Sequence, residues 1–435
     1  MEYERLLSRY GYAELRIERS SESFISIKDS EVRHSSGTVS GVSVRVLEGG
    51  SWGFAAGNHG EPIDDLLKRA ARLAKLGKGK IALSLPEPVK KTIKDRLEPV
   101  DGSEQVKDLV EAAGAMRADK VTSRTIACTD SVVREEFHSS QGAEIIQESG
   151  YTYLSCSCIA KSGAVMQRGS DRTWSRAGFA KLQTLETAGR AKDKAVRLLD
   201  AGPPPKGRFM VIFDPEMTGV FSHEAVGHAC EADSVTDRES VLAGRLGQAI
   251  GNGLVTIIDD PTADGFGRYA YDDEGVPAKP AVLLESGVLK GYMNSMETAR
   301  ELGHELNGHA RAGDYSNVPI VRMSNTYFQK GKSKVGEVFD VREGVYLKGM
   351  KGGSVDIFSG GFMFKAEESY WIKGGGKERM MRDVTITGNI LQTLLDVECV
   401  GGDFGTSPGM CGKFGQEAPV CDGGPHIRVK NVAIG

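Results

Sequence analysis

The segment His223-Glu224-Ala225-Val226-Gly227-His228 places two imidazoles and a carboxylate close together in the chain. Neutral imidazole is a good zinc ligand, and a glutamate beside a bound metal can take a proton from water. Histidines four positions apart lie about 40° apart around an ideal α-helix, whereas these, five apart, lie roughly 140° apart. They can share one ion only if the backbone is over-wound, under-wound or bulged between them. Gly227 is the residue type that allows such a departure.

A second stretch fits the same pattern of residue types, His304-Glu305-Leu306-Asn307-Gly308-His309. Gly303 predicts the end of a short helix just before it, and Gly308 and Gly313 favour a loop. A loop is a poor place to fix two metal ligands without other support. We therefore expect solvent-exposed loop histidines at His304 and His309.

A catalytic zinc ion usually has three protein ligands and one position open to water. The candidates for the third ligand are Cys230, Glu231, Asp233, Cys399, Cys411 and Cys421. Glu231 and Asp233 could equally support the histidines through hydrogen bonds. Lys413 would favour the thiolate of Cys411, but Cys421 has a similar glycine-rich setting, so residue chemistry alone does not separate the two cysteines.

Two further groups of candidate residues have a simpler interpretation. Cys156 and Cys158 point the same way on a predicted strand and are expected to be buried, small apolar side chains. Asp272-Asp273-Glu274-Gly275 lacks the spaced oxygen ligands of a calcium loop, so an exposed acidic turn is expected there.

The elements that must hold the first histidine pair are a strand and a helix. Phe209–Phe213 is predicted to be a short buried strand. Asp214-Pro215-Glu216 then supplies an N-cap, a first-turn proline and an early acid, which together predict a helix that carries His223 and His228.

The proline run between Gly202 and Gly207 predicts a boundary between two regions. We expect a mixed α/β N-terminal domain over 1–201, with a further division into 1–100 and 101–201. A glycine-rich and strand-rich domain over 208–435, a curved sheet or barrel, would carry the metal-site helix, and the fold class is α+β.

Hydrophobic periodicity and turn residues predict the remaining elements. The predicted helices are at 62–74, 106–116, 185–199 and 295–302. The predicted strands are at 41–46 with a turn at 48–50, at 151–160 after a turn at 149–150, and at 384–387, with a hairpin at 282–292.

Composition narrows the classes of protein. The 435 residues carry a net charge of −4 and no basic block, which gives no electrostatic support for nucleic-acid binding. No apolar stretch is long enough to span a bilayer. Seven cysteines without an export signal indicate a reducing compartment, so the chain is expected to be cytoplasmic.

Several separated motifs resemble the TldD/PmbA family of metallopeptidases, also called modulators of DNA gyrase. The resemblance spans nearly the whole chain and is firmest after Gly207. It is carried by the segment 223–228 with Glu231 and Asp233, by 272–277, 289–292, 323–327 and 411–416, and in the first half by 44–46 with 52–55.

The resemblance implies one zinc ion per chain, held by His223, His228 and Cys411, with Glu224 as the catalytic base. It leaves His304 and His309 without a role, and it leaves Cys230 as an unassigned thiol near the metal. It also implies that a motif-bearing TldD-type chain pairs with a PmbA-type (TldE) chain to enclose a cleft for unfolded peptides. This chain is short for the bacterial type, so a homodimer and a mixed pair are both open. The alternative is a non-catalytic peptide-binding or regulatory module in which Cys230 or Cys421 closes a structural metal site.

Overall fold

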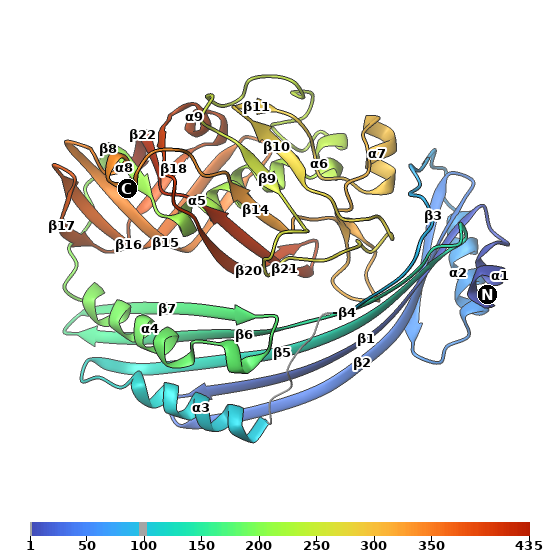
Figure 1. Ribbon diagram of the computed structural model, residues 1–435, viewed down its shortest axis with the longest axis horizontal. Coiled ribbons are helices and arrows are strands. Elements are labelled where there is room, and N and C mark those ends of the chain that lie inside the picture. Colours follow the sequence, from blue (N-terminus) through green and yellow to red (C-terminus); the bar gives the residue numbers. More distant parts are fainter. Residues whose placement is uncertain (1, 95–101) are drawn as a thin grey trace.

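The computed structural model describes residues 2–94 and 102–435. It has the expected α+β fold, with a strongly curved N-terminal sheet below and a strand-rich C-terminal region above (Figure 1). No helix among the described residues is long and apolar enough to cross a membrane.

The N-terminal sheet has seven strands in the order β3-β2-β1-β5-β6-β4, with β7 also paired to β6. Neighbouring strands of this sheet run antiparallel, except that β4 runs parallel to β6. The bounds are β1 Tyr12–Lys28, β2 Glu31–Glu48, β3 Ser51–Asn58, β4 Lys90–Lys94, β5 Val121–Ser139, β6 Glu144–Ser162 and β7 Val165–Ser175. Helices of this region are α1 Glu2–Leu7, α2 Ile63–Ala74, α3 Gly102–Ala115, η1 Phe179–Lys181 and α4 Thr184–Leu198.

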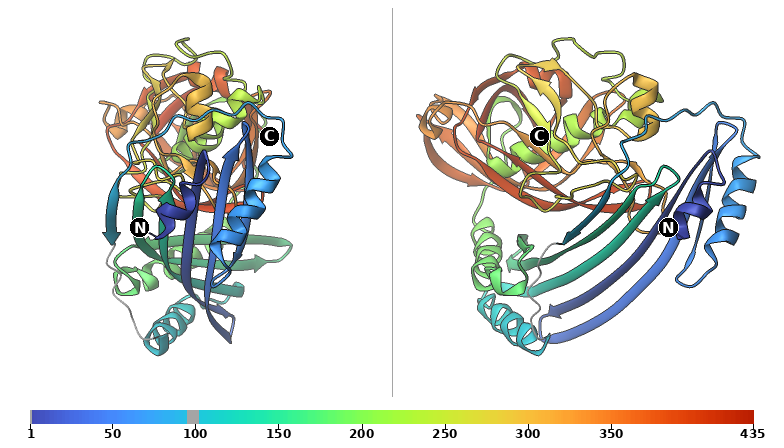
Figure 2. Two further views of the ribbon diagram at one scale, coloured as in Figure 1. Left: turned by 90° about the vertical axis from the view of Figure 1, so that its right-hand side faces the viewer. Right: turned by 45° about the vertical axis from the view of Figure 1, so that its right-hand side comes forward.

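The two faces of this sheet differ because side chains alternate along each strand. Leu15 and Ile25 of β1 lie on the outer face, in apolar clusters that include residues of α2 and of α3 and α4, respectively. Glu14 and Arg16 of β1 lie on the inner face, and Arg16 contacts Asp273 and the backbone of Asn317 in the C-terminal region. The outer face is therefore an apolar core, and helices cover it (Figure 2).

Most of the predicted N-terminal elements are present. The hairpin of β2 and β3 turns at Gly49-Gly50, and the helices fall within a few residues of their expected bounds. The expected turn at Ser149-Gly150 is wrong, because β6 runs through these residues and pairs them with Val133 and Val132 of β5. A long partner strand keeps the ladder continuous where the local residue types favour a turn.

The C-terminal region contains a closed five-stranded barrel. Its strands follow the order β15-β8-β22-β18-β16, and pairing between β15 and β16 closes it. The bounds are β8 Gly207–Phe213, β15 Glu343–Asp356, β16 Gly361–Lys373, β18 Thr385–Asn389 and β22 Ile427–Ile434, with β17 Gly376–Met381 and β19 Val397–Val400 attached.

A six-stranded C-terminal sheet lies beside the barrel, in the order β11-β10-β9-β14-β21-β20. Its strands are β9 Ile257–Asp259, β10 Ala281–Glu285, β11 Val288–Leu289, β14 Asn325–Phe328, β20 Gly405–Lys413 and β21 Gln416–Gly424; β12 Ala310–Arg311 and β13 Ile320–Val321 form a separate pair. The helices are α5 Pro215–Phe221, η2 Ser222–Gly227, η3 His228–Cys230, α6 Ala232–Thr236, α7 Met296–Leu302, α8 Val335–Val338 and α9 Ile390–Leu395.

Buried charges join the N-terminal sheet to the C-terminal region. Arg45 of β2 lies 2.8 Å from Glu274 and also contacts Glu14 of β1. Asp272 accepts hydrogen bonds from the backbone of Glu274, Val276 and Ala310. Asp272 and Glu274 are only 4% and 3% exposed, so the expectation of an exposed acidic turn is wrong. A distant arginine, which the local sequence does not reveal, makes burial of this turn possible.

Candidate metal centre

The helix that follows β8 begins as predicted and then changes geometry. Asp214 caps it by accepting a hydrogen bond from the backbone N–H of Met217 at 2.8 Å. After α5 the chain continues as the π-helix η2, in which the N–H of His228 donates to the carbonyl of His223. A π-helical turn closes over five residues, so His223 and His228 come to the same side of the helix. The predicted departure from α-helical geometry is present.

Gly227 permits this arrangement for a reason other than the expected one. Its backbone is ordinary and right-handed, with φ −54° and ψ −62°. A Cβ atom built on Gly227 would lie 2.0 Å from Sδ of Met323, which precedes β14. The close approach of Met323, rather than a special backbone conformation, limits the size of the side chain at this position.

Cys411 on β20 completes a group of three donors with His223 and His228. One ligand atom from each lies within 4.8 Å of the others, and within residues 2–94 and 102–435 no other group of three or more His, Cys, Asp or Glu side chains comes together in this way. Sγ of Cys411 is 3.5 Å from Nε2 of His228. We call these three residues the donor cluster.

A carboxylate holds each imidazole from behind. Nδ1 of His223 lies 2.7 Å from Oδ1 of Asp422, and Nδ1 of His228 lies 3.0 Å from Oε2 of Glu231. Contacts of this kind fix the ring orientation and leave Nε2 free for a metal. Glu231 therefore has the supporting position that the sequence allowed for it. Asp422 was missed, because no local motif links it to a histidine far away in the chain.

Asp233 does not contact either histidine. Its carboxylate accepts hydrogen bonds from Nζ of Lys413 at 2.7 and 2.8 Å, and the same ammonium lies 3.1 Å from Glu231. Lys413 and Cys411 are two positions apart on β20, so both side chains point to the same face of the strand. This lysine connects the strand that carries the thiol to the carboxylate that holds His228.

The contacts within the donor cluster favour a thiolate at Cys411 and protonated imidazoles while no metal is bound. Burial raises the pKa of the Cys411 thiol, but contacts with His223 and His228 outweigh burial and lower the pKa to about 5. Burial lowers the pKa of His228, but Glu231 and Cys411 raise it to about 9. Zinc binds a thiolate and two neutral imidazoles well, so a bound zinc ion would displace the protons of the imidazoles.

The other sulfur candidates lie elsewhere. Cys230 is fully buried in the apolar core of the C-terminal region, and burial raises the pKa of its thiol. Burial also raises the pKa of Cys421 to about 11. Cys399 belongs to a separate apolar cluster with Ile212. Cys230 is not among the donor atoms that lie within 4.8 Å of one another.

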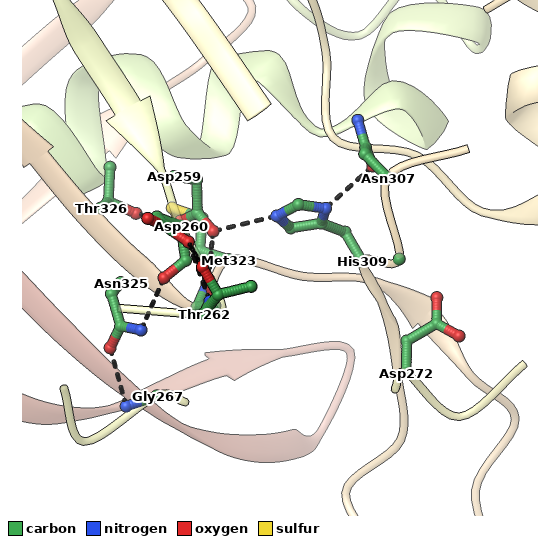
Figure 3. Close-up of polar contacts among 12 residues, drawn as sticks. Asp259, Asp260, Thr262, Gly267, Asp272, Asn307, His309, Met323, Asn325 and Thr326 are labelled. Atoms are coloured by element: carbon green, nitrogen blue, oxygen red, sulfur yellow. Dashed lines mark hydrogen bonds and ion pairs between the residues drawn. The ribbon is translucent and has the colours of Figure 1, made fainter. Parts of the chain in front are cut away.

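The second histidine pair is not brought together around a common point. His304 is partly buried and stacks on Tyr292, with ring centroids 5.9 Å apart. His309 is completely buried, with Nδ1 2.8 Å from Oδ1 of Asn307 and Nε2 3.0 Å from Oδ1 of Asp259 (Figure 3). The expectation of an exposed loop histidine is therefore wrong for His309. The neighbouring strands supply a carboxylate partner that the loop-like local sequence does not show.

A cleft of about 460 Å³ opens onto the donor cluster. Glu224 lines it together with His223, His228 and Cys411. Tyr153 and Arg172, from the inner face of the N-terminal sheet, form part of the opposite wall.

Sequence profiles of one metallopeptidase family match almost all of this architecture. The PmbA/TldA metallopeptidase domain 1 matches residues 13–74, the central domain matches 95–199, and the C-terminal domain matches 206–435. A metalloprotease of Methanothermobacter thermautotrophicus is 42% identical over 98% of this chain and 96% of its own. A zinc metalloprotease TldD homolog of Saccharolobus solfataricus is 30% identical over 98% of this chain and 96% of its own.

Solved structures share the fold at low sequence identity. A Thermotoga maritima protein described as a candidate modulator of a DNA gyrase has a TM-score of 0.84 and 22% identity, covering 100% of this chain and 99% of that one. TldE from Thermococcus kodakarensis has a TM-score of 0.80 and 23% identity, with 100% of both chains covered. The fold and the profile matches define a metallopeptidase-type architecture. The chain belongs to the PmbA/TldD family.

Proposed function

We propose that the chain is a zinc-dependent peptidase whose metal ligands are His223, His228 and Cys411, with one zinc ion per chain. The observation that carries this proposal is the meeting of three donor atoms within 4.8 Å, from a π-helix and a distant strand. The zinc named in the Saccharolobus solfataricus homolog supports the choice of metal. Bound zinc would polarise a carbonyl oxygen and lower the pKa of water at the site.

Glu224 is the proposed catalytic base. It adjoins His223 in η2 and lines the cleft, which places it where it can accept a proton from water and pass it to the leaving amine. Asp422 and Glu231 orient the imidazoles. A thiolate donates more charge to the metal than imidazole does, so we expect slow turnover.

We propose that the substrates are unfolded or specialised peptides. We also propose that the chain acts together with a second subunit. An extended peptide fits a cleft between two β-rich walls, and strand addition is one way in which sheets bind such chains. The shared fold with the Thermococcus kodakarensis TldE supports pairing with a TldE-like chain, with a homodimer as the other arrangement.

The alternative, a binding module with a structural metal, would need a closed four-ligand site. Within the described ranges no fourth His, Cys, Asp or Glu joins the donor cluster, and Cys230 packs in the core. This observation favours the catalytic proposal.

The test is Glu224→Gln, compared with Glu305→Gln in the second motif. Glu224→Gln should retain zinc and lose peptide cleavage by roughly 10²- to 10⁴-fold, because only the proton acceptor is removed. Glu305→Gln should retain both the zinc and the peptide cleavage. Zinc content and cleavage of an unfolded protein are measured on the same preparations, and full activity in Glu224→Gln would refute the assignment.

A further inference from the structure

The metal-site cleft continues into a second hollow along the inner face of the N-terminal sheet. This hollow has a volume of about 370 Å³. It shares Tyr153, Arg172, Met350 and Lys351 with the cleft that contains the donor cluster. A peptide whose scissile bond lies at the cluster can therefore extend into it. We call it the basic cavity, for the charges described below.

The floor of the basic cavity is formed by hydroxyl groups. Thr125 of β5 pairs with Ser157 of β6, which pairs with Ser170 of β7, so one row of hydroxyls crosses three strands. Ser155 lies two positions from Ser157 on the same face. The hydroxyls of Thr125, Ser155 and Ser157 make no side-chain hydrogen bond to any other described residue, and they remain available as donors.

The acidic side chains of the cavity wall are already neutralised. Asp171 is paired with Arg190, and Glu367 is paired with Lys194. Neither carboxylate therefore repels an incoming anion with its full charge.

Two cations that line the cavity lack a close partner. Arg168 of β7 is exposed and forms no ion pair with a carboxylate of the described chain. Nζ of Lys351, in β15, is 3.7 Å from Asp383, which Lys365 approaches more closely at 3.3 Å. Arg172 is different, because it lies 2.6 Å from Glu216 and donates to Ser407. The cavity thus has free hydroxyl donors and two weakly compensated positive charges.

We propose that the basic cavity is a substrate subsite that binds a carboxylate, from an acidic side chain or from a free peptide C-terminus. The inference rests on the proposed peptidase function and adds a substrate class to it. Arg168 and Lys351 approach the bound chain from opposite walls, one from the N-terminal sheet and one from the barrel. The hydroxyl row supplies hydrogen bonds to the carboxylate oxygens.

The test compares peptides that differ only in charge. An unfolded peptide with two glutamates is matched with its glutamine counterpart, and each is made with a free and an amidated C-terminus. The glutamate peptide should have the lower KM. Lys351→Gln and Arg168→Gln should each raise that KM roughly fivefold. Arg168 lines only the basic cavity, so Arg168→Gln should leave kcat and the KM of the glutamine peptide little changed. Lys351→Glu should reverse the preference.

A matched control and a binding measurement separate the possible outcomes. Lys290→Gln, at an exposed lysine of the C-terminal region away from the cavity, should change neither KM. If the bound carboxylate is that of the peptide terminus, the glutamate and glutamine peptides will have equal KM values, and amidation will raise the KM of both. Equal KM values for all the peptides in the unmodified protein would overturn the subsite and leave the peptidase proposal intact.

If no peptide is cleaved, the peptidase proposal fails, and fluorescence anisotropy of labelled peptides on the Glu224→Gln protein still tests the subsite. Tighter binding of the glutamate peptide that is lost in Lys351→Gln supports the subsite. Equal binding of all four peptides, with free and with amidated C-termini, overturns it.

Discussion

At the scale of single residues, each donor of the proposed metal site is held by a second residue. Asp422 and Glu231 lie behind the two imidazoles, and the two imidazoles stabilise the thiolate of Cys411. Asp233 is one step further away, because it contacts Lys413 rather than a histidine. The residues that hold the donors therefore come from both the helix and the two strands that face it.

Removal of Cys411 should abolish stoichiometric zinc binding. Two imidazoles remain in Cys411→Ala, and loss of a direct ligand should cost more than the roughly 100-fold that loss of a supporting contact can cost. His304→Ala is the matched control, since its ring stacks on Tyr292 away from the cluster. Zinc affinity is measured by competition with a chelator, and equal affinities in the two variants would contradict the ligand assignment.

At the scale of elements, the decisive feature is the π-helical turn between the two histidines. It brings residues five apart onto one side, and it packs so closely that Met323 lies where a side chain of Gly227 would be. The turn also presents Glu224 to the cleft. Helix geometry and packing thus act together at one position.

Gly227→Ala should destabilise the protein by about 1–3 kcal/mol, because the added methyl group collides with Sδ of Met323. Gly189→Ala in α4 is the control, since a methyl group added there would have no other atom within 4 Å and alanine favours a helix. Denaturant unfolding of the metal-free proteins measures the free energy of unfolding of both variants. Met323→Ala in the Gly227→Ala background should recover part of the loss, and an unaltered stability of Gly227→Ala would show that the contact is not limiting.

At the scale of the whole molecule, a polar interface holds the N-terminal sheet against the C-terminal region. Arg45 lies between Glu14 and Glu274 and stacks 4.4 Å from the ring centre of Trp52. All three charged side chains are almost completely buried. The cleft at the donor cluster also has walls from both regions.

Arg45→Met should reduce the free energy of unfolding by about 3–5 kcal/mol, since it leaves two buried carboxylates without their cation. Arg33→Met is the control, because the Arg33–Glu31 pair is exposed and should contribute nothing measurable. Thermal unfolding of both variants tests this. A similar small effect in the two would mean that water replaces the arginine at the interface.

The division into domains 1–201 and 208–435 stays a proposal. In its favour, no strand before Gly207 pairs with a strand after it in any sheet of the described chain. The further division at residue 100 lies outside the described residues.

The sequence by itself determined the elements whose signals are local. The cap at Asp214, the alternation along β2, the helix stop at Gly303 and the donor types of the metal motif all follow from neighbouring residues. The family motifs also singled out Cys411, which chemistry alone did not separate from Cys421.

Only the tertiary structure decided which distant groups meet. Asp422 reaches His223, Asp259 reaches the buried ring of His309, and Arg45 neutralises Glu274. None of these pairs is close in the chain, so no local pattern encodes it. Burial of a charge depends on a partner that folding brings from elsewhere, because an unpaired charge would be too costly to remove from water.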